Sequence, residues 1–391
     1  MSSRVSVYIH IPFCRTRCDY CDFFSTACGK NGVPDSYVAA VCNEIKARLA
    51  YSGSSCVRTV YIGGGTPSLL SASQLKKISG ALSSVSAPKS GHLEEFTLEV
   101  NPDDVTRDFL LAAADAGVDR LSCGVQAFED DVLSGVKRRC GGAGVLEALE
   151  LISLAWKGRF SADIISALPG QTEENFCRGI RSLVEYPVDH ISMYSLTIEP
   201  ETPLGKKLDS GLISYDFDAA DRMWLMGRDI LENSGFRQYE VSNFSRPGKQ
   251  CIHNMVYWRL EDYIGCGAGA TGSFYGSSGR RFTNTKNIEE YIRFWLSDSP
   301  VPESAPGEKE MLSTEVQAFE FFMMGLRTLR GVCLSDYKER FRSDIPENII
   351  SEMNLWKNRS LADFYYSENG LCFALNSQGI LFLNDFLRKI L

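Results

Sequence analysis

The stretch Cys14-Arg15-Thr16-Arg17-Cys18-Asp19-Tyr20-Cys21 places three cysteines in a C-x3-C-x2-C array close to the start of the chain. The preceding run, Val5-Ser6-Val7-Tyr8-Ile9-His10-Ile11, is short, apolar and rich in β-branched residues, which predicts a β-strand. Pro12 ends this strand, so we expect the cysteines on a loop at its C-terminal end. Three thiolates on one loop can bind three irons of a cubane cluster and leave the fourth iron open to another ligand.

Two other origins of the array stay open at this point. The cysteines could cluster by chance in a cysteine-rich chain, or they could bind zinc. No further Cys or His follows at the spacing of a zinc finger, although Cys28 is a candidate for a fourth ligand. The residues alone therefore favour an iron–sulfur cluster without deciding it.

The composition predicts a protein with a sizeable core and no membrane span. Its 391 residues allow one large α/β domain and a smaller one, and no apolar run approaches the length of a bilayer-crossing helix. Thirteen cysteines without an export signal indicate a reducing cytoplasm, where thiols bind metals rather than form disulfides. Isolated cysteines such as Cys56, Cys123 and Cys372 are expected to be small core residues. The net charge of −8 disfavours binding to nucleic acid.

Strand-like and helix-like segments alternate through the first half of the chain, which is typical of βα units around a parallel sheet. Six strands are expected, over residues 5–11, 59–62, 96–100, 120–125, 160–165 and 190–195. The helices between them are expected over residues 36–50, 71–82, 106–116 and 145–155, with another beginning at residue 172.

Unusual polar and small residues fall at or just after the C-terminal ends of these strands. They are the three cysteines, Gly63-Gly64-Gly65, Glu99, Gln126 and Asp163. In a parallel (β/α) barrel all these strand ends lie on one face, so residues far apart in sequence meet there. We therefore predict an α/β fold with such a barrel over about residues 1–200, although the alternation alone would also allow a doubly wound sheet.

The cysteine array, with Tyr20 before its last cysteine, resembles the signature of the radical S-adenosylmethionine (SAM) superfamily. The flanking text Tyr8-Ile9-His10-Ile11-Pro12-Phe13-Cys14 resembles one branch, which contains oxygen-independent coproporphyrinogen III dehydrogenases (HemN type) and HemW-type haem chaperones. The resemblance implies a [4Fe–4S] cluster held by Cys14, Cys18 and Cys21, with SAM on the open iron. It also implies that the barrel is open and six-stranded, a partial (β/α)6 TIM-like barrel.

Other residues match positions that bind SAM in this family. Gly64 and Gly65, followed by Thr66, resemble the motif that approaches the amino group of SAM, because glycine lets the backbone come close to a ligand. Glu99 would be a SAM ligand in this comparison, whereas a rim salt bridge is its ordinary interpretation. The remaining matches are Tyr8, beside the cluster, and Gln126, Arg138 and Asp163, which correspond to residues around a second SAM in HemN-type enzymes.

The stretch Cys251-Ile252-His253-Asn254-Met255-Val256-Tyr257-Trp258 carries the functional distinction. Histidine supplies an axial nitrogen to haem iron, and Tyr and Trp supply flat apolar surface for a macrocycle. For an isolated HNxxYW, a hydrogen-bonded core histidine with packing aromatics is the more ordinary interpretation. With Gln238-Tyr239-Glu240-Val241-Ser242-Asn243-Phe244 upstream, the segment resembles the HemW-type pattern, which implies haem binding by His253, Asn254, Tyr257 and Trp258.

Two departures separate this chain from the HemN-type enzymes. Phe23 stands where those enzymes carry an additional cysteine, and a first strand near Val5 leaves no room for their N-terminal extension. Both departures argue against coproporphyrinogen oxidase activity, and no catalytic residue is expected. We expect a haem chaperone that transfers haem to acceptor proteins, some of them membrane-bound and contacted transiently; the alternative is an oxygen-independent coproporphyrinogen III dehydrogenase.

The second half of the chain divides into two expected parts. Residues 201–305 extend the barrel and contain a helix over 216–233, the HNxxYW motif, a Gly-rich segment over 265–279 and a linker over 297–307. Residues 310–391 form a winged-helix-like α+β domain with helices over 314–329, 345–357 and 380–391 and a hairpin that turns at Glu368-Asn369-Gly370. Nine Lys and Arg from residue 311 onward are balanced by ten acids, which favours an interaction or capping module over DNA binding.

Overall fold

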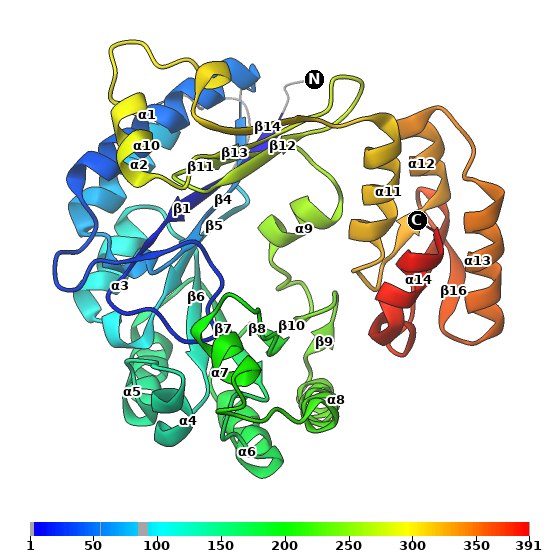
Figure 1. The fold of residues 1–391 in the computed structure, drawn as a ribbon, viewed down its shortest axis with the longest axis horizontal. Helices are drawn as coiled ribbons and strands as arrows, with labels where there is room; N and C mark the ends of the chain where they lie inside the picture. The colour runs from blue at the N-terminus through cyan, green and yellow to red at the C-terminus, as the bar shows by residue number, and fades with distance from the viewer. Residues whose placement is uncertain (1–3, 55, 85–92, 391) are drawn as a thin grey trace.

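A row of parallel strands in chain order forms the centre of the molecule (Figure 1). The computed structural model describes residues 4–54, 56–84 and 93–390. The six central strands are β1 (Arg4–Ile11), β4 (Cys56–Gly64), β5 (Glu95–Val100), β6 (Arg120–Gln126), β7 (Arg159–Ser166) and β8 (His190–Ser195). Each pairs in parallel with the next. The six strands expected from the sequence are thus confirmed.

Helices return the chain from the end of one strand to the start of the next and pack on the outer face of the sheet (Figure 1). They are α1 (Asp35–Ser52), α2 (Ala72–Ser83), α3 (Arg107–Asp115), α4 (Asp130–Gly135), α5 (Gly142–Ala155), α6 (Glu173–Leu183), α7 (Pro203–Asp209) and α8 (Phe217–Asn233). Polar side chains fix where several of them begin: Ser71, Thr106, Thr172 and Asp216 each accept a backbone N–H from the first turn. The predicted alternation of strands and helices therefore forms a partial, TIM-like arrangement.

The sheet does not close into a barrel, because further strands extend it on both sides. Beyond β8 lie β10 (Asn243–Ser245) and β9 (Arg237–Gln238), both antiparallel to their neighbours. Beyond β1 lies β11 (Tyr263–Cys266), which is parallel to it, followed by the antiparallel β12 (Thr271–Phe274), β13 (Arg280–Asn284) and β14 (Gly307–Met311). These strands together form one open, twelve-stranded sheet.

No strand is expected from the sequence in the Gly-rich segment over 265–279, whereas the structure has two that extend into it. Strand β14 begins at Gly307, the last residue of the expected linker, and strands β11 and β12 together include six residues of the Gly-rich segment. Its glycines serve close strand packing: a Cβ on Gly265 would lie 2.1 Å from the carbonyl oxygen of Thr271, and one on Gly272 would lie 2.4 Å from the ring of Phe282. A helix that the sequence did not suggest, α10 (Ile288–Trp295), follows β13 and buries Tyr291 and Trp295 completely.

The C-terminal part has its own hydrophobic core and lies apart from the sheet, on the far side of α9 (Ile252–Trp258) (Figure 1). Its elements are α11 (Thr314–Gly325), β15 (Val332–Cys333), α12 (Leu334–Phe341), α13 (Glu347–Asn358), β16 (Ala362–Ser367), β17 (Gly370–Leu375) and α14 (Leu383–Ile390). The hairpin is where the sequence predicts it, whereas the helix over 314–329 ends early, at Gly325. The last helix begins after a 3-10 turn, and Leu391, its expected end, lies outside the described residues.

Two cysteines depart from the expectation of free thiols. Cys333 and Cys372 lie directly opposite each other on β15 and β17 and form a disulfide. Cys372 is a core residue, as expected, but it is paired and not isolated. The partners are 39 residues apart, and only the pairing of β15 with β17 brings them together.

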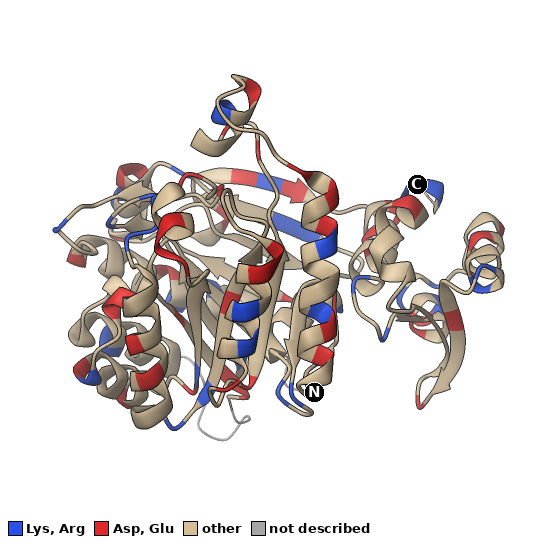
Figure 2. Ribbon diagram, turned by 90° about the horizontal axis from the view of Figure 1, so that it is seen from below, with Lys and Arg blue, Asp and Glu red and all other residues tan. Residues whose placement is uncertain are grey.

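Two further features of the fold are the distribution of its charged residues and the lengths of its helices. Figure 2 shows Lys and Arg interspersed with Asp and Glu over the helices, and exposed ion pairs such as Lys338–Asp344 and Arg388–Asp385 occur in the C-terminal part. Among the residues that the structure describes, no helix combines the length and the apolar character that crossing a lipid bilayer requires.

The C-terminal hairpin offers a test of the second core. Phe373 is fully buried on β17 and packs against Phe364 and Phe386, with ring centroids 5.2 and 5.6 Å away. Phe373→Ala should lower the free energy of unfolding by about 3–5 kcal/mol, because it leaves a cavity in this core. Tyr366→Ala, on the neighbouring strand and 83% exposed, is the matched control and should change it little. Equal effects in urea denaturation would contradict this packing.

Candidate functional site

The cysteine loop leaves the end of β1 and is closed at its base by a second small sheet. Strand β2 (Phe13–Cys14) pairs with β3 (Thr26–Ala27), and the N–H of Cys28 donates to the carbonyl oxygen of Cys14 at 2.8 Å. Cys14 is buried and both Cys18 and Cys21 are partly exposed. The structure thus places the array at the C-terminal end of the first strand, where the sequence predicts it.

The thiols lie close enough to influence one another. Burial raises the pKa of Cys21 to about 11, and negative charge on Cys18 and Cys14 raises it further. Burial also raises the pKa of Cys14, and Cys18 adds to the effect. Three thiolates in this loop would therefore need a cationic group beside them.

The space beside Cys14 fits a cluster better than a single ion. Among the described residues, no three Cys, His, Asp or Glu side chains converge as ligands of one metal ion. A cubane does not require that convergence, because each thiolate binds a different iron. Gly65 keeps the space open, since a Cβ there would lie 2.9 Å from Cys14 Sγ. The loop therefore fits a [4Fe–4S] cluster on Cys14, Cys18 and Cys21.

An acid inside the array fixes the loop to the rest of the protein, and sequence reasoning missed it. Asp19 is 1% exposed and forms ion pairs with Lys137 at 2.9 Å and Lys207 at 2.6 Å. Its backbone also bonds to Val136 and Leu204. A carboxylate between two cysteines of the array was the available signal, but its partners lie more than 100 residues away in the chain.

Glu99 and the triple glycine form one unit at the ends of β4 and β5. The Tyr61 hydroxyl donates to Glu99 Oε1 at 2.9 Å and the N–H of Gly64 donates to Oε2 at 3.1 Å. A Cβ on Gly63 would lie 2.9 Å from Glu99, so only glycine allows this approach. The side chain of Thr66 interacts with Cys14, which joins the unit to the cysteine loop. The structure thus brings together the residues for which the sequence predicts SAM contacts.

Two partly buried carboxylates, Glu99 and Asp163, face the same interior. Burial raises the pKa of Glu99 to about 7, and the charge of Asp163 adds to the rise. Burial likewise raises the pKa of Asp163, whose carboxylate accepts from Ser122 Oγ at 3.2 Å. A cationic group bound here would favour the ionised form of both acids and would be stabilised by them.

Gln126 and Arg138 meet around Gly124, where a Cβ would lie 2.8 Å from Gln126 Nε2 and 3.0 Å from Arg138 Nη2. Arg138 donates to the carbonyl oxygen of Gly124 and also interacts with Cys18 and Tyr20. These two expected SAM contacts therefore border the cysteine loop.

Tyr8 is linked to the cysteine loop through His10. The carbonyl oxygen of Phe24 can only accept, so Nε2 of His10 donates to it at 2.8 Å. Nδ1 then accepts from the Tyr8 hydroxyl at 2.8 Å. His10 thus connects the Tyr8 side chain to the backbone of Phe24.

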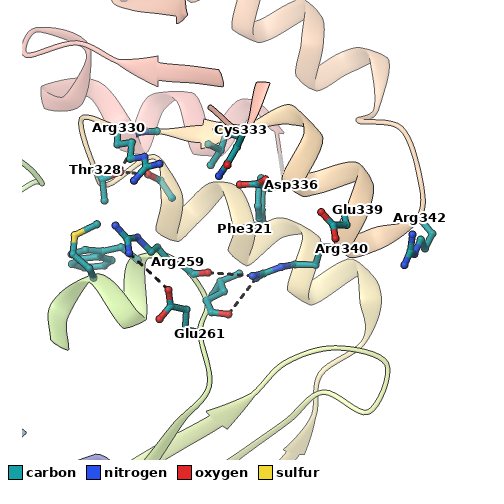
Figure 3. A pocket seen from close by; sticks show the side chains of 17 residues that line it. Arg259, Glu261, Phe321, Thr328, Arg330, Cys333, Asp336, Glu339, Arg340 and Arg342 are labelled. Carbon is teal, nitrogen blue, oxygen red and sulfur yellow. Dashed lines mark hydrogen bonds and ion pairs between the residues drawn. The ribbon is translucent and has the colours of Figure 1, made fainter. Parts of the chain in front are cut away.

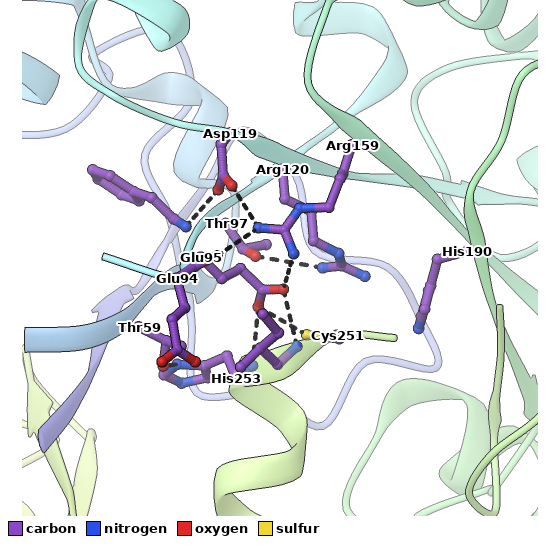
Figure 4. A network of polar contacts seen from close by, with 12 residues as sticks. Thr59, Glu94, Glu95, Thr97, Asp119, Arg120, Arg159, His190, Cys251 and His253 are labelled. Carbon is purple, nitrogen blue, oxygen red and sulfur yellow. Dashed lines mark hydrogen bonds and ion pairs between the residues drawn. The ribbon is translucent and has the colours of Figure 1, made fainter. Parts of the chain in front are cut away.

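Helix α9 carries the HNxxYW motif and begins on a buried carboxylate (Figure 4). Glu95, at the start of β5, accepts the N–H groups of Ile252 at 2.9 Å and His253 at 3.0 Å, and the thiol of Cys251 at 3.2 Å. Arg159 donates to the same carboxylate at 3.0 Å. Burial raises the pKa of Glu95, but Arg120, the N–H of Ile252 and Arg159 outweigh it, so the pKa lies below its ordinary value.

His253 is fully buried and both of its ring nitrogens have partners. Nδ1 lies 2.8 Å from Thr59 Oγ1, and Nε2 lies 2.8 Å from the Tyr257 hydroxyl. Thr59 donates its proton to Ser6, so Nδ1 of His253 donates to Thr59 and Nε2 accepts from Tyr257. Burial lowers the pKa of His253 to about 4, so the ring is neutral at physiological pH.

The motif is divided between the two faces of α9. His253 and Tyr257, four residues apart, face the sheet, whereas Met255 and Trp258 line a cleft toward the C-terminal part. Asn254 is partly exposed. Thr59, the partner of His253, lies five residues before Gly64 on β4, which is roughly 16 Å along a strand. The HNxxYW motif and the cysteine loop thus occupy different ends of the sheet interior.

An open α/β sheet with a cysteine loop, a glycine loop and buried acids at its C-terminal ends is the arrangement of a radical SAM protein. Residues 8–183 match the family model of the radical SAM superfamily, and residues 312–347 match that of the HemN C-terminal domain. Membership of this superfamily implies a [4Fe–4S] cluster and SAM.

Comparison with similar proteins identifies a family within this superfamily. The chain is 34% identical to "Heme chaperone HemW" of Escherichia coli over 99% of its length and 98% of the relative's, and 35% identical to that of Bacillus subtilis over 86% of both. A solved structure of coproporphyrinogen III oxidase (HemN) from Escherichia coli superposes with a TM-score of 0.80 at 20% identity, covering 99% of this chain and 89% of that one, and so shares the fold. The chain belongs to the HemW family.

The cysteine loop yields a prediction with an internal control. Replacing Cys14, Cys18 or Cys21 singly with Ala should lower the iron and sulfide retained after anaerobic reconstitution, because each thiolate holds one iron. Cys28→Ala, on the same loop, should retain the wild-type amounts and the wild-type electron paramagnetic resonance signal after reduction. Loss of the cluster in Cys28→Ala would instead make Cys28 a ligand.

Glu99 yields a prediction for stability against pH. A raised pKa in the folded state means that the stabilising contribution is complete below the unfolded value of 4.5 and is lost as pH rises through about 7. This shift corresponds to roughly 3 kcal/mol, which Glu99→Gln should retain because an amide has no proton to lose. Urea denaturation at pH 5 and pH 8, without added iron or SAM, measures the difference.

The control for this measurement is Glu174→Gln, since Glu174 is an exposed acid on α6. It should reproduce the wild-type dependence on pH. A Glu99→Gln variant with the wild-type dependence would show that Glu99 does not hold its proton in the folded state.

Proposed function

We propose that this chain binds haem and transfers it to haem-requiring acceptor proteins, with the cluster and SAM as regulators or co-reactants. The observation that carries the proposal is the similarity over nearly the whole length to proteins named heme chaperone HemW. The HNxxYW motif supports it, because α9 presents Trp258 to a cleft and holds a neutral histidine, His253, on its opposite face toward the sheet. Contacts with acceptors, including membrane-bound ones, would be transient, and a cytoplasmic location stays a prediction.

Axial ligation of haem iron by His253 also stays a prediction, and the structure defines what it requires. A ligating imidazole must be neutral, and His253 is neutral because burial lowers its pKa to about 4. Its Nε2, however, accepts a hydrogen bond from Tyr257. Ligation through Nε2 therefore requires the imidazole to exchange the Tyr257 hydroxyl for iron.

Oxidation of coproporphyrinogen is the alternative function. The structural likeness to HemN concerns the fold, and the position of the additional HemN-type cysteine is occupied here by Phe23, whose side chain is 68% exposed. A phenylalanine offers no ligand to iron at this position.

Absorbance titration with hemin tests the proposed function. The wild-type protein should give a saturable shift of the Soret band, and the absence of any shift would contradict haem binding. If His253 ligates the iron, His253→Ala should alter the spectrum, and Tyr257→Phe should tighten binding because it removes the competing partner of Nε2.

His190→Ala is the matched control. His190 is also buried, with its ring nitrogens 2.8 Å from Ser161 Oγ and from the Tyr239 hydroxyl, but it lies outside the motif. It should leave the hemin spectrum unchanged. A wild-type spectrum in His253→Ala would limit His253 to holding α9 against β4.

A further inference from the structure

A cleft of about 630 Å³ separates α9 from the C-terminal part (Figure 3). One wall comes from the end of α9 and the residues after it, including Met255, Trp258 and Arg259. The other wall comes from α11, α12 and the turn between them, including Phe321 and Arg330. This volume lies within the range of about 300–1,000 Å³ that is typical of cofactor and small-molecule sites.

The cleft is rich in arginine. Arg259, Arg330, Arg340 and Arg342 line it together with three acids, Glu261, Asp336 and Glu339. Glu261 is already engaged, since it forms an ion pair with Arg58 and lies 3.9 Å from Arg259. Within the described residues, no hydrogen bond or ion pair occupies the side chain of Arg330 or Arg342.

Arg259 and Arg330 lie close enough in the cleft for their charges to interact. Burial lowers the pKa of Arg259, the charge of Glu261 raises it, and the charges of Arg330 and Arg58 lower it. Arg340 reinforces the same place, because it donates to the backbone carbonyl oxygens of Arg259 and Leu260 at 3.3 Å. An anionic group bound between Arg259 and Arg330 would relieve this repulsion.

Aromatic and sulfur-containing side chains line the cleft next to these charges. Trp258 precedes Arg259 directly, and its indole Nε1 is buried without a hydrogen-bond partner among the described residues. Met255 and Phe321, both buried, add apolar surface. The cleft thus combines flat apolar surface with paired guanidinium groups, which suits a planar macrocycle that carries carboxylates.

We infer that haem docks in this cleft with its ring against Trp258 and its two carboxylates on Arg259 and Arg330. The inference rests on the proposed function and adds to it the site and the groups that recognise the ligand. Each guanidinium can bind a carboxylate through two hydrogen bonds. Because Arg259 follows α9 and Arg330 follows α11, the carboxylates would bridge the two parts of the chain. His253 faces the sheet from the opposite face of α9, so this recognition does not depend on ligation of the iron by His253.

The experiment compares hemin binding to the full-length wild-type protein and to the double variant Arg259→Gln/Arg330→Gln. We expect the dissociation constant to rise at least tenfold in the variant, because two charge-assisted carboxylate contacts are lost. Arg178→Gln/Arg222→Gln, which removes two exposed arginines from α6 and α8, is the matched control and should bind as the wild type does. Arg259→Lys/Arg330→Lys keeps the charge but loses the paired hydrogen bonds and should give an intermediate value.

The dimethyl ester of hemin isolates the role of the carboxylates. It should bind the wild type and the Arg259→Gln/Arg330→Gln variant equally weakly. If the wild type binds hemin and that variant binds it equally well, the cleft assignment is overturned while haem binding stands. If the wild type does not bind hemin, the proposed function fails and this inference fails with it. Thermal unfolding of each variant identifies any that has lost its fold.

Discussion

The buried carboxylate of Glu95 is the interaction on which the relation between the sheet and α9 depends. It accepts two of the free N–H groups at the start of the helix and is itself paired with Arg159, with Arg120 close by (Figure 4). An ionised acid in such a site is tolerated only because these partners offset the cost of removing it from water. Loss of one partner of a buried charge typically costs about 3–5 kcal/mol. The position of the HNxxYW motif thus depends on one residue of β5.

Helix α9 connects two regions of different chemistry. On the sheet side, Tyr61 contacts both His253 and Glu99. Its ring lies 5.3 Å from the ring of His253, and its hydroxyl donates to Glu99. A change in the protonation of Glu99 would therefore affect His253 through one side chain, that of Tyr61. On its other side, α9 ends beside the interdomain cleft, whose far wall is held by bonds such as Val241 N–H to the carbonyl oxygen of Arg327. The helix is thus the physical link between the sheet interior and the C-terminal part.

The sequence predicts those elements that depend on local residue patterns and on the positions of Pro and Gly. Six strands and the helices between them follow from periodicity, Pro and Gly, and the C-terminal hairpin follows from Glu368-Asn369-Gly370. Strands β11 and β12 escape this reasoning, because glycines that permit close strand packing have the same composition as a loop.

Contacts between residues far apart in the chain could not be predicted from the sequence for a different reason. Glu95 is one of two adjacent acids at the start of a strand, and nothing local shows that it caps a helix 157 residues later. The partners of Asp19 and the Cys333–Cys372 disulfide are equally invisible before the chain folds. The site residues at strand ends could be grouped in advance, because a parallel sheet forces its strand ends together. The orientation of His253 could not, since it depends on which face of α9 meets β4.

The opposite charges of the two regions give a physical reason for keeping them apart. SAM carries a sulfonium and an amino group as well as one carboxylate, so its net charge is positive, and the sheet interior contains two partly buried carboxylates, Glu99 and Asp163. Haem carries two carboxylates, and the cleft beyond α9 offers arginines. A buried acid repels a carboxylate as strongly as it attracts an amine, so on this proposal each ligand is disfavoured in the other's site. Separation by one helix that contacts both would then allow the cluster and SAM to influence haem without sharing its binding site.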